Sequence, residues 1–169
     1  SSSAHTCVLT STGSKCWGLG TSGPLGYGDT ITRGDHSNEM GTYLPAHDFG
    51  TNKVAIDTSS NRHACVILED RSVKCWGYNT EYQAGYGDTI LRGDGSNEMG
   101  TNLPTLSLGT SAKAKNIDVS YSSTCVLLYN GRIKCWGDNT YGDAGAEADT
   151  AQGSSSNEMG DALDYVDLE

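Results

Sequence analysis

The sequence predicts an all-β protein made of three tandem units, each about 59 residues long. A segment that ends in Lys-Cys-Trp-Gly occurs three times, at residues 5–18, 63–77 and 123–137. Helical periodicity is absent, and glycine, with 22 of the 169 residues, is too frequent for long helices. The short runs in each segment, such as CVLL and IKCWG, are rich in β-forming residues and are separated by turn-forming ones.

A second block follows each of these segments. GYGDTITRGDHSNEMGTYLP (26–45) and GYGDTILRGDGSNEMGTNLP (85–104) are nearly identical, and a diverged copy occupies residues 145–164. A β-like segment, KVAID (53–57) or KNIDVS (115–120), lies between units. Self-similarity at a fixed period is the signature of a repeat architecture. We therefore divide the chain into repeats at residues 1–58, 59–118 and 119–169, of which the third is truncated.

Each unit contains a predicted hairpin that places its two cysteines opposite each other. In the third unit, the loop YNG (129–131) suits a three-residue turn closed by glycine in the left-handed conformation. This loop pairs Leu128 with Arg132. Counting outward from that pair puts Cys125 opposite Cys135 at a non-hydrogen-bonded position, where the side chains of paired strands lie closest.

The other two hairpins keep the same cysteine register. The second unit has a three-residue loop at 69–71, and the first has a four-residue loop from Thr10 to Gly13. We predict three disulfides, Cys7–Cys16, Cys65–Cys75 and Cys125–Cys135; the alternative is three pairs of reduced, packed thiols. Each short-loop disulfide stabilises the fold by about 2–3 kcal/mol. Persistent disulfides indicate an oxidising compartment.

Composition and charge exclude several classes of protein. Leu, Ile, Val and Phe supply only 27 of the 169 residues, so a single large aliphatic core is hard to build. No apolar run approaches the roughly 18 residues that cross a bilayer. A net charge of −10 repels phosphate and therefore weighs against nucleic-acid binding.

The pattern C-V-L-L-x-x-G-x-x-K-C-W-G-x-N-x-x-G-x-x-G at 125–145 resembles the regulator of chromosome condensation repeat, in the cysteine-containing form of secreted bacterial and protist proteins. The resemblance extends over essentially the whole chain. It implies four-stranded β-propeller blades around a central channel, usually in rings of seven. It also implies that Trp17, Trp76 and Trp136 pack between neighbouring blades; a ligand platform is the alternative.

The sequence departs from the family pattern in two places. The usual Gly-Gln-Leu-Gly becomes GPLG (23–26), YQAG (82–85) and GDAG (142–145), and the third unit loses its Tyr-Gly-Asp step. Three blades do not close a ring, since propellers have typically four to eight. The stretch equivalent to residues 51–58 is also missing from one of the three repeats. We therefore expect either part of a longer propeller or a subunit whose open blade edges pair with other chains.

The second block carries candidate metal ligands. Asp29, Asp35 and Glu39 recur as Asp88, Asp94 and Glu98, and then as Asp149, Ser154 and Glu158. Clustered carboxylates on a glycine-rich loop are the ligands that calcium prefers. The spacing matches neither an EF-hand loop nor the nonapeptide calcium repeat. The alternative is that these carboxylates accept hydrogen bonds from loop amides, as turn caps do.

Two further motifs favour structural interpretations. Arg33-Gly34-Asp35 repeats as residues 92–94, and this adhesion tripeptide is more economically explained as a turn or an ion pair. His5 and His63 lie two residues before a cysteine, but a Cys–His nucleophile would need a free thiol. We find no phosphate loop, nucleophile elbow or dinucleotide fingerprint, and we predict no catalytic residue and no resident cofactor apart from the calcium hypothesis.

The leading hypothesis is a non-enzymatic, extracellular or cell-surface propeller module, with the periplasm as the alternative compartment. It would contact a protein partner, or other copies of itself through open blade edges, and would bind neither nucleic acid nor membrane. Variation between the blocks at 19–25, 78–84 and 138–144 would form the contact surface. The first alternative is a calcium-dependent adhesion or carbohydrate-binding module. The second is nucleotide exchange on a small GTPase, the family's best-known activity, which the cysteine pairs disfavour.

Overall fold

The all-β prediction is confirmed. A computed structural model describes residues 4–147 and 149–168; residues 1–3, 148 and 169, in the predicted first and third repeats, lie outside it. The described strands are β1 (His5–Thr10), β2 (Gly13–Gly18), β3 (Ala55–Ser60), β4 (His63–Leu68), β5 (Val73–Gly77), β6 (Ala114–Val119), β7 (Ser123–Leu128) and β8 (Ile133–Gly137). Two short 3₁₀ helices, η1 (Ser156–Glu158) and η2 (Gly160–Ala162), follow. None of the described helices has the length and apolar character to cross a membrane.

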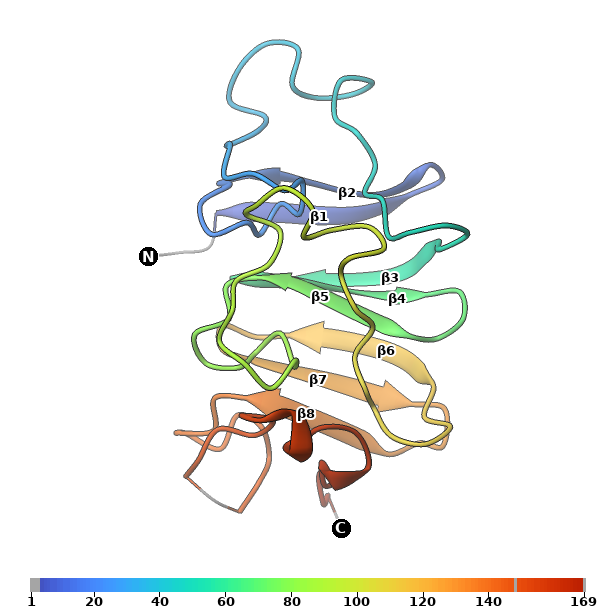
Figure 1. The fold of residues 1–169 in the computed structure, drawn as a ribbon, viewed down its shortest axis with the longest axis vertical. Helices are drawn as coiled ribbons and strands as arrows, with labels where there is room; N and C mark the ends of the chain where they lie inside the picture. Colours follow the sequence, from blue (N-terminus) through green and yellow to red (C-terminus); the bar gives the residue numbers. More distant parts are fainter. Residues whose placement is uncertain (1–3, 148, 169) are drawn as a thin grey trace.

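The strands form three antiparallel sheets, in the orders β1-β2, β3-β4-β5 and β6-β7-β8, which are stacked in chain order (Figure 1). Each is one blade. The predicted repeat boundaries fall inside β3 and at the end of β6, so the first strand of the second and third blades comes largely from the preceding repeat.

Four strands in each blade are not confirmed among the described residues. Two blades have three strands and the first has two. Where a fourth strand would lie, a single antiparallel bridge joins the last strand to the following loop: Gly18 with Arg33, Gly77 with Arg92, and Gly137 with Gln152. The loop is glycine-rich and leaves the sheet after that bridge, so no ladder develops.

The hairpins hold the three predicted disulfides. Cys65 pairs with Cys75 and Cys125 with Cys135, and in each bond the Cα atoms are 4.1 Å apart. Cys7 and Cys16 form the third. Separations this short are typical of non-hydrogen-bonded strand pairs. All six cysteines are therefore oxidised in the structure, and no thiol is free.

The turn of the first hairpin is shorter than predicted. Thr10 pairs directly with Gly13, so the loop has two residues rather than four. The Thr10 hydroxyl accepts the N–H of Thr12 at 3.2 Å and lies 2.7 Å from the carbonyl of Gly13. The hairpin therefore gains one strand pair without changing the cysteine register.

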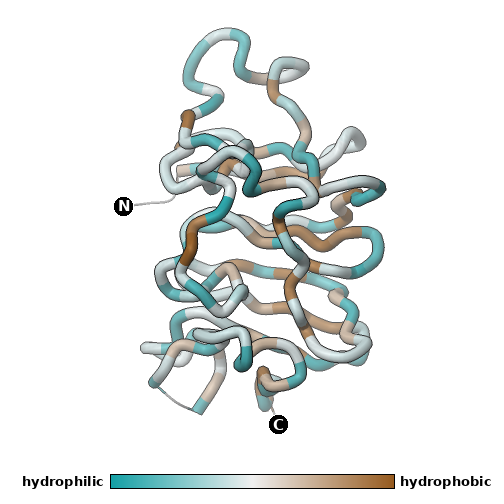
Figure 2. The backbone as a smooth tube through the Cα atoms, viewed as in Figure 1, coloured by the Kyte–Doolittle hydropathy of each residue, from teal (hydrophilic) through white to brown (hydrophobic). Residues whose placement is uncertain are grey.

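The core lies between blades rather than inside one sheet. Strand β4 is buried along its whole length. Its even positions, such as Val66 and Leu68, belong to the cluster shared with the first blade, and its odd positions, such as Ile67, belong to the cluster shared with the third. Hydrophobic residues accordingly gather on the strands in the middle of the stack, whereas the long loop after β2 is mostly hydrophilic (Figure 2).

Two tryptophans lie in these inter-blade clusters and contact the backbone of the preceding blade. Trp76 and Trp136 are fully buried, and their indole N–H groups donate to the carbonyls of Pro24 (3.1 Å) and Gln83 (3.0 Å). A Cβ on Gly85 would lie 2.5 Å from Nε1 of Trp136, so only glycine fits beneath the ring. Trp17, the first of the three, is only half-buried.

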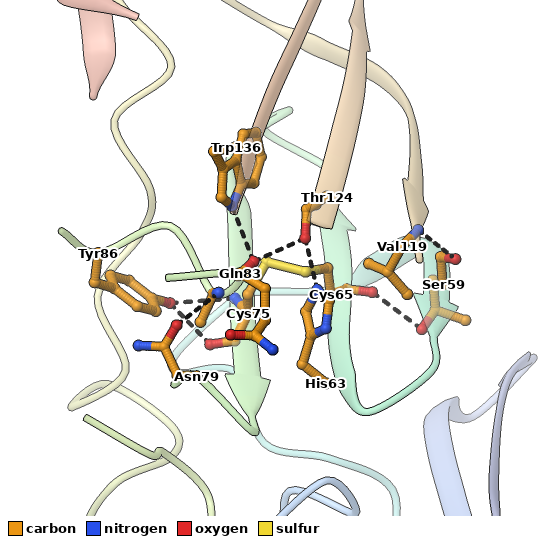
Figure 3. The surroundings of a disulfide bond; sticks show 12 residues. Ser59, His63, Cys65, Cys75, Asn79, Gln83, Tyr86, Val119, Thr124 and Trp136 are labelled. Carbon is orange, nitrogen blue, oxygen red and sulfur yellow. Dashed lines mark hydrogen bonds between the residues drawn. A yellow bond between two sulfur atoms is a disulfide. The ribbon is translucent and has the colours of Figure 1, made fainter. Parts of the chain in front are cut away.

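A buried histidine joins the second and third blades (Figure 3). The hydroxyl of Thr124 donates to the Gln83 carbonyl at 2.8 Å and lies 2.6 Å from Nε2 of His63. Because that hydroxyl proton is committed to a carbonyl, Nε2–H of the imidazole must be the donor to Thr124. Nδ1 then has no hydrogen-bond partner. Burial lowers the pKa of His63 to about 3.

We predict that this histidine makes the fold less stable in mild acid. Between pH 6.5 and 3 the unfolded chain binds a proton at His63 that the folded chain excludes, so the free energy of unfolding falls as the pH falls, by about 1.4 kcal/mol for each pH unit. Urea unfolding at pH 7.5 and pH 5 measures the loss. His63→Ser, which copies Ser123 of the third repeat, should reduce the difference between the two pH values. Equal pH dependence in both proteins would contradict this role.

Candidate interaction surface

The three loops that the sequence predicts as a contact surface lie on one side of the stack. They follow β2, β5 and β8, at residues 19–25, 78–84 and 138–144. Figure 1 shows the segments after these strands on the left of the view and the hairpin turns on the right. Each blade thus has a loop end and a hairpin-turn end, and the three variable loops all lie at the loop end.

In each of these loops, buried residues at equivalent positions fix the conformation of the backbone. Leu25, Ala84 and Ala144 are buried. The buried Asn79 accepts the N–H of Ala84 with its side-chain oxygen at 2.8 Å, and Asn139 does the same for Ala144 at 3.0 Å. The backbone of the second and third loops is therefore held in the same way, while the first loop has Gly20 in place of the asparagine.

Some of the positions that differ between the loops are exposed or partly exposed. Leu19, Tyr78 and Asp138 are equivalent, as are Ser22, Glu81 and Tyr141. Tyr141 is 88% exposed and Leu19 is 42% exposed. Hydrogen bonds from the Thr140 side chain and N–H lower the pKa of Asp138, which keeps this carboxylate ionised at neutral pH.

A cation–π stack connects two blades at the same end. The guanidinium of Arg62 lies 3.6 Å from the ring centroid of Tyr78 and 4.4 Å from that of Tyr121. Tyr121 is 50% exposed. Arg62 and Tyr121 were missed by the sequence reasoning, because they come from the turns before β4 and β7 and meet only when the blades stack. We call Leu19, Arg62, Tyr78, Tyr121, Asp138 and Tyr141 the loop face.

The candidate metal ligands lie in the second block and have partners of their own. Asp29 forms a two-pronged ion pair with Arg33 at 2.8 and 2.7 Å, and Asp88 pairs with Arg92 at 2.9 and 2.8 Å. The ion pairs lower the pKa of both carboxyls. The two guanidiniums also lie over tyrosine rings. The arginine of each Arg-Gly-Asp tripeptide is therefore bound to the aspartate four residues before it and not to the aspartate of the tripeptide.

The glutamates of the block cap the loop backbone. One oxygen of Glu98 accepts three N–H groups, from Gly93, Asp94 and Gly95, at 2.8–3.1 Å. Glu39 does the same in the first unit. In the third, Glu158 accepts the N–H and hydroxyl of Ser154, both at 2.8 Å. A carboxylate oxygen surrounded by N–H donors is a poor ligand for a cation, since the donors favour negative charge there.

Asp35 and Asp94, the remaining carboxylates among the predicted metal ligands, lie beside the glutamates that cap the loop backbone. Asp35 is exposed and lies beside His36, and these two with Glu39 bring ligand atoms within 4.8 Å of one another. Burial, and then the Glu98 carboxylate, raise the pKa of Asp94. The structure thus groups Asp35 with Glu39 and Asp94 with Glu98, but it places Asp29 and Asp88 in ion pairs with arginine.

Known proteins resemble this chain in sequence and in fold. Residues 54–83 and 114–143 match the regulator of chromosome condensation (RCC1) repeat. Yeast RCC1 (Prp20), solved bound to Kap60, is similar over 99% of this chain with a TM-score of 0.65 and 15% identity. Prp20p of Saccharomyces cerevisiae, described with its binding properties to Gsp1p and histones, is similar over 99% with a TM-score of 0.64 and 15% identity.

The chain corresponds to 36% and 37% of the length of those two yeast propellers. At 15% identity the likeness carries the fold alone, and the repeat match carries the repeat type. The first matched segment covers β3 to β5 and most of the variable loop at 78–84, and the second covers β6 to β8 and most of the variable loop at 138–144. Residues 54–83 and 114–143 are therefore regulator of chromosome condensation repeats, and the chain folds as blades of that type of β-propeller.

Proposed function

We propose that this chain is a non-enzymatic protein-interaction module that works outside the cell or at its surface, with the periplasm as the alternative compartment. The observation that carries the proposal is the loop face, where exposed side chains change from blade to blade on a backbone that buried residues hold constant. Loops on a rigid scaffold are the usual place for recognition.

The side chains of the loop face favour a protein partner. Tyrosine and arginine are enriched among the residues that contribute most to protein–protein binding. Here the Arg62 guanidinium is stacked between Tyr78 and Tyr121, so the three side chains lose little further freedom on binding. The two yeast propellers have been studied in contact with proteins, which supports this class of partner without identifying ours.

The disulfides support an oxidising compartment and weigh against nucleotide exchange in a nucleus, where thiols are kept reduced. We predict that the protein from its native source, denatured without reductant, has no reactive thiol, and that six appear after reduction. Quantitative alkylation with mass measurement tests this. Six reactive thiols before reduction would contradict the proposed compartment and would instead support an intracellular location.

The contact surface can be tested with the two tyrosines on either side of strand β7. Tyr121 precedes β7 on the loop face, and Tyr129 follows β7 at the hairpin end. They are 50% and 55% exposed, and each ring lies near an arginine, Arg62 or Arg71. We predict that Tyr121→Ala abolishes partner capture and that the matched Tyr129→Ala leaves it unchanged, with both losing less than about 1 kcal/mol of stability.

The measurement is quantitative cross-linking of the purified protein and its variants to intact cells of the source, followed by mass spectrometry. A partner bound through the loop face is recovered with the wild type and Tyr129→Ala and lost with Tyr121→Ala. Recovery of the same proteins by all three would contradict the proposed surface.

Calcium distinguishes the adhesion alternative. Because Glu98 already accepts three N–H groups, we predict that calcium releases no heat and leaves the melting temperature unchanged. We further predict that Glu98→Ala costs about 1 kcal/mol or more, since three partly buried N–H groups lose their acceptor. The exposed Glu69→Ala is the control. Calorimetric binding that disappears in Glu98→Ala would instead support the calcium-dependent module.

A further inference from the structure

Arg62 is held between two tyrosine rings where the second and third blades meet. Its guanidinium lies 3.6 Å from the ring centroid of Tyr78 and 4.4 Å from that of Tyr121. Tyr78 follows the last strand of the second blade, and Tyr121 precedes the middle strand of the third. The other arginines that the structure describes each lie over one ring: Arg33, Arg71, Arg92 and Arg132.

Two of those arginines show how a guanidinium over a tyrosine is used in this fold. Arg33 lies 4.3 Å from the ring centroid of Tyr27 and donates two hydrogen bonds to the carboxylate of Asp29, at 2.8 and 2.7 Å. Arg92 repeats the arrangement in the second unit. One face of the guanidinium thus lies on a ring, and its edge donates to both oxygens of a carboxylate.

The carboxylate is missing at Arg62. In the two ion pairs the aspartate precedes the arginine by four residues, and the residue at that distance before Arg62 is Thr58. The Thr58 hydroxyl donates to the Cys65 carbonyl at 3.2 Å. Within residues 4–147 and 149–168, no acidic side chain forms an ion pair with the Arg62 guanidinium. This arginine is therefore stacked like the other two but has no anion at its edge.

The two rings prepare Arg62 for such an anion. Because they cover both faces of the guanidinium, its remaining N–H groups point outward along the edge, where their planar arrangement matches the two oxygens of a carboxylate. An ordinary surface ion pair loses much of its value to the entropy of ordering two long side chains. The tyrosines already restrict this arginine, so less entropy is lost when an anion binds.

The surroundings of Arg62 favour a carboxylate over a phosphate. Sites that recognise phosphorylated residues use clusters of arginine. The loop face, as defined by its residues, has one cationic side chain, and its Asp138 is ionised. The net charge of −10 further repels an anion that carries several charges. A single guanidinium therefore suits a singly charged carboxylate of a protein.

We infer that Arg62, held between Tyr78 and Tyr121, binds a carboxylate group of the protein partner with both oxygens against the edge of the guanidinium. The inference rests on the proposed function, because it names the chemistry by which the loop face recognises that partner. The tyrosines are positioning residues, and the carboxylate of the partner takes the place that Asp29 has beside Arg33.

Nuclear magnetic resonance of the isotope-labelled protein tests the contact through the Nε–H signals of its five arginines. The probe is a short glutamate peptide with blocked ends. We expect the Nε–H signal of Arg62 to shift as the peptide is added. The signal of Arg71, which lies over a single ring at the hairpin end, should not shift. The blocked glutamine peptide should shift neither signal.

Two further peptides identify the anion and its source. A glutamine peptide with a free carboxyl end carries a terminal carboxylate, and a phosphoserine peptide carries a phosphate. A shift of the Arg62 signal with the first peptide supports the inference and assigns a chain terminus as a source of the carboxylate. Tighter binding of the phosphoserine peptide than of the glutamate peptide would overturn the inference, because the site would then select phosphate.

Substitutions separate the shape of the guanidinium from its charge. Arg62→Lys keeps the charge but removes the two-pronged donor, so the affinity for the glutamate peptide should fall by at least about fivefold. The matched Arg71→Lys should bind as the wild type does. Tyr121→Ala should bind more weakly than the wild type, because the guanidinium loses one of the rings that hold it. The melting temperature of each variant verifies that it keeps the fold.

An Arg62 signal that stays in place with both carboxylate peptides would overturn the inference, as would equal affinity of Arg62→Lys and the wild type. The outcome is separable from that of the loop-face experiment. If Tyr121→Ala loses the partner while the Arg62 signal does not move, the contact surface stands and the carboxylate site fails. If the Arg62 signal moves while Tyr121→Ala still captures the partner, the carboxylate site stands and the contact surface fails.

Discussion

The fold depends on the contact between the indole of one blade and the backbone of the blade before it. Trp76 and Trp136 each donate to a carbonyl of the preceding blade while the ring covers a glycine. The indole thereby satisfies its only polar group and buries a large apolar surface in one place. Gly26 and Gly85 are required twice over, by positive φ and by the absence of room for a Cβ.

This contact compensates for the shortage of aliphatic residues. The two inter-blade clusters draw on both faces of β4, so one short strand contributes to two cores. Between the first strands of the second and third blades, hydrogen bonds rather than apolar contacts join the two blades. The hydroxyl of Ser59 accepts the N–H of Val119 and lies 3.1 Å from Asp118, joining β3 to β6. Each hairpin also carries a disulfide, which limits how far the unfolded chain can expand.

Local features were predictable from the sequence, and features that depend on the stacking of blades were not. Turn chemistry alone gives the register of β7 and β8 and hence Cys125 opposite Cys135, because few turns fit a three-residue loop closed by glycine. The variable loops could be predicted as one surface from the sequence. The contact between Arg62 and Tyr121 could not, because these residues are 59 positions apart and lie in different turns. The fourth strand was expected from the family resemblance and not from local sequence, and among the described residues only a single bridge forms at its place in each blade.

The acidic block shows a different limit of prediction from the sequence. Carboxylates on a glycine-rich loop suit either a cation or a set of backbone amides, and the residue types are the same in both cases. What decides between them is the direction of the N–H groups around Glu98, which depends on the backbone and not on composition. Arg33, four residues after Asp29, was the one available signal, since a bidentate partner at that distance removes a ligand.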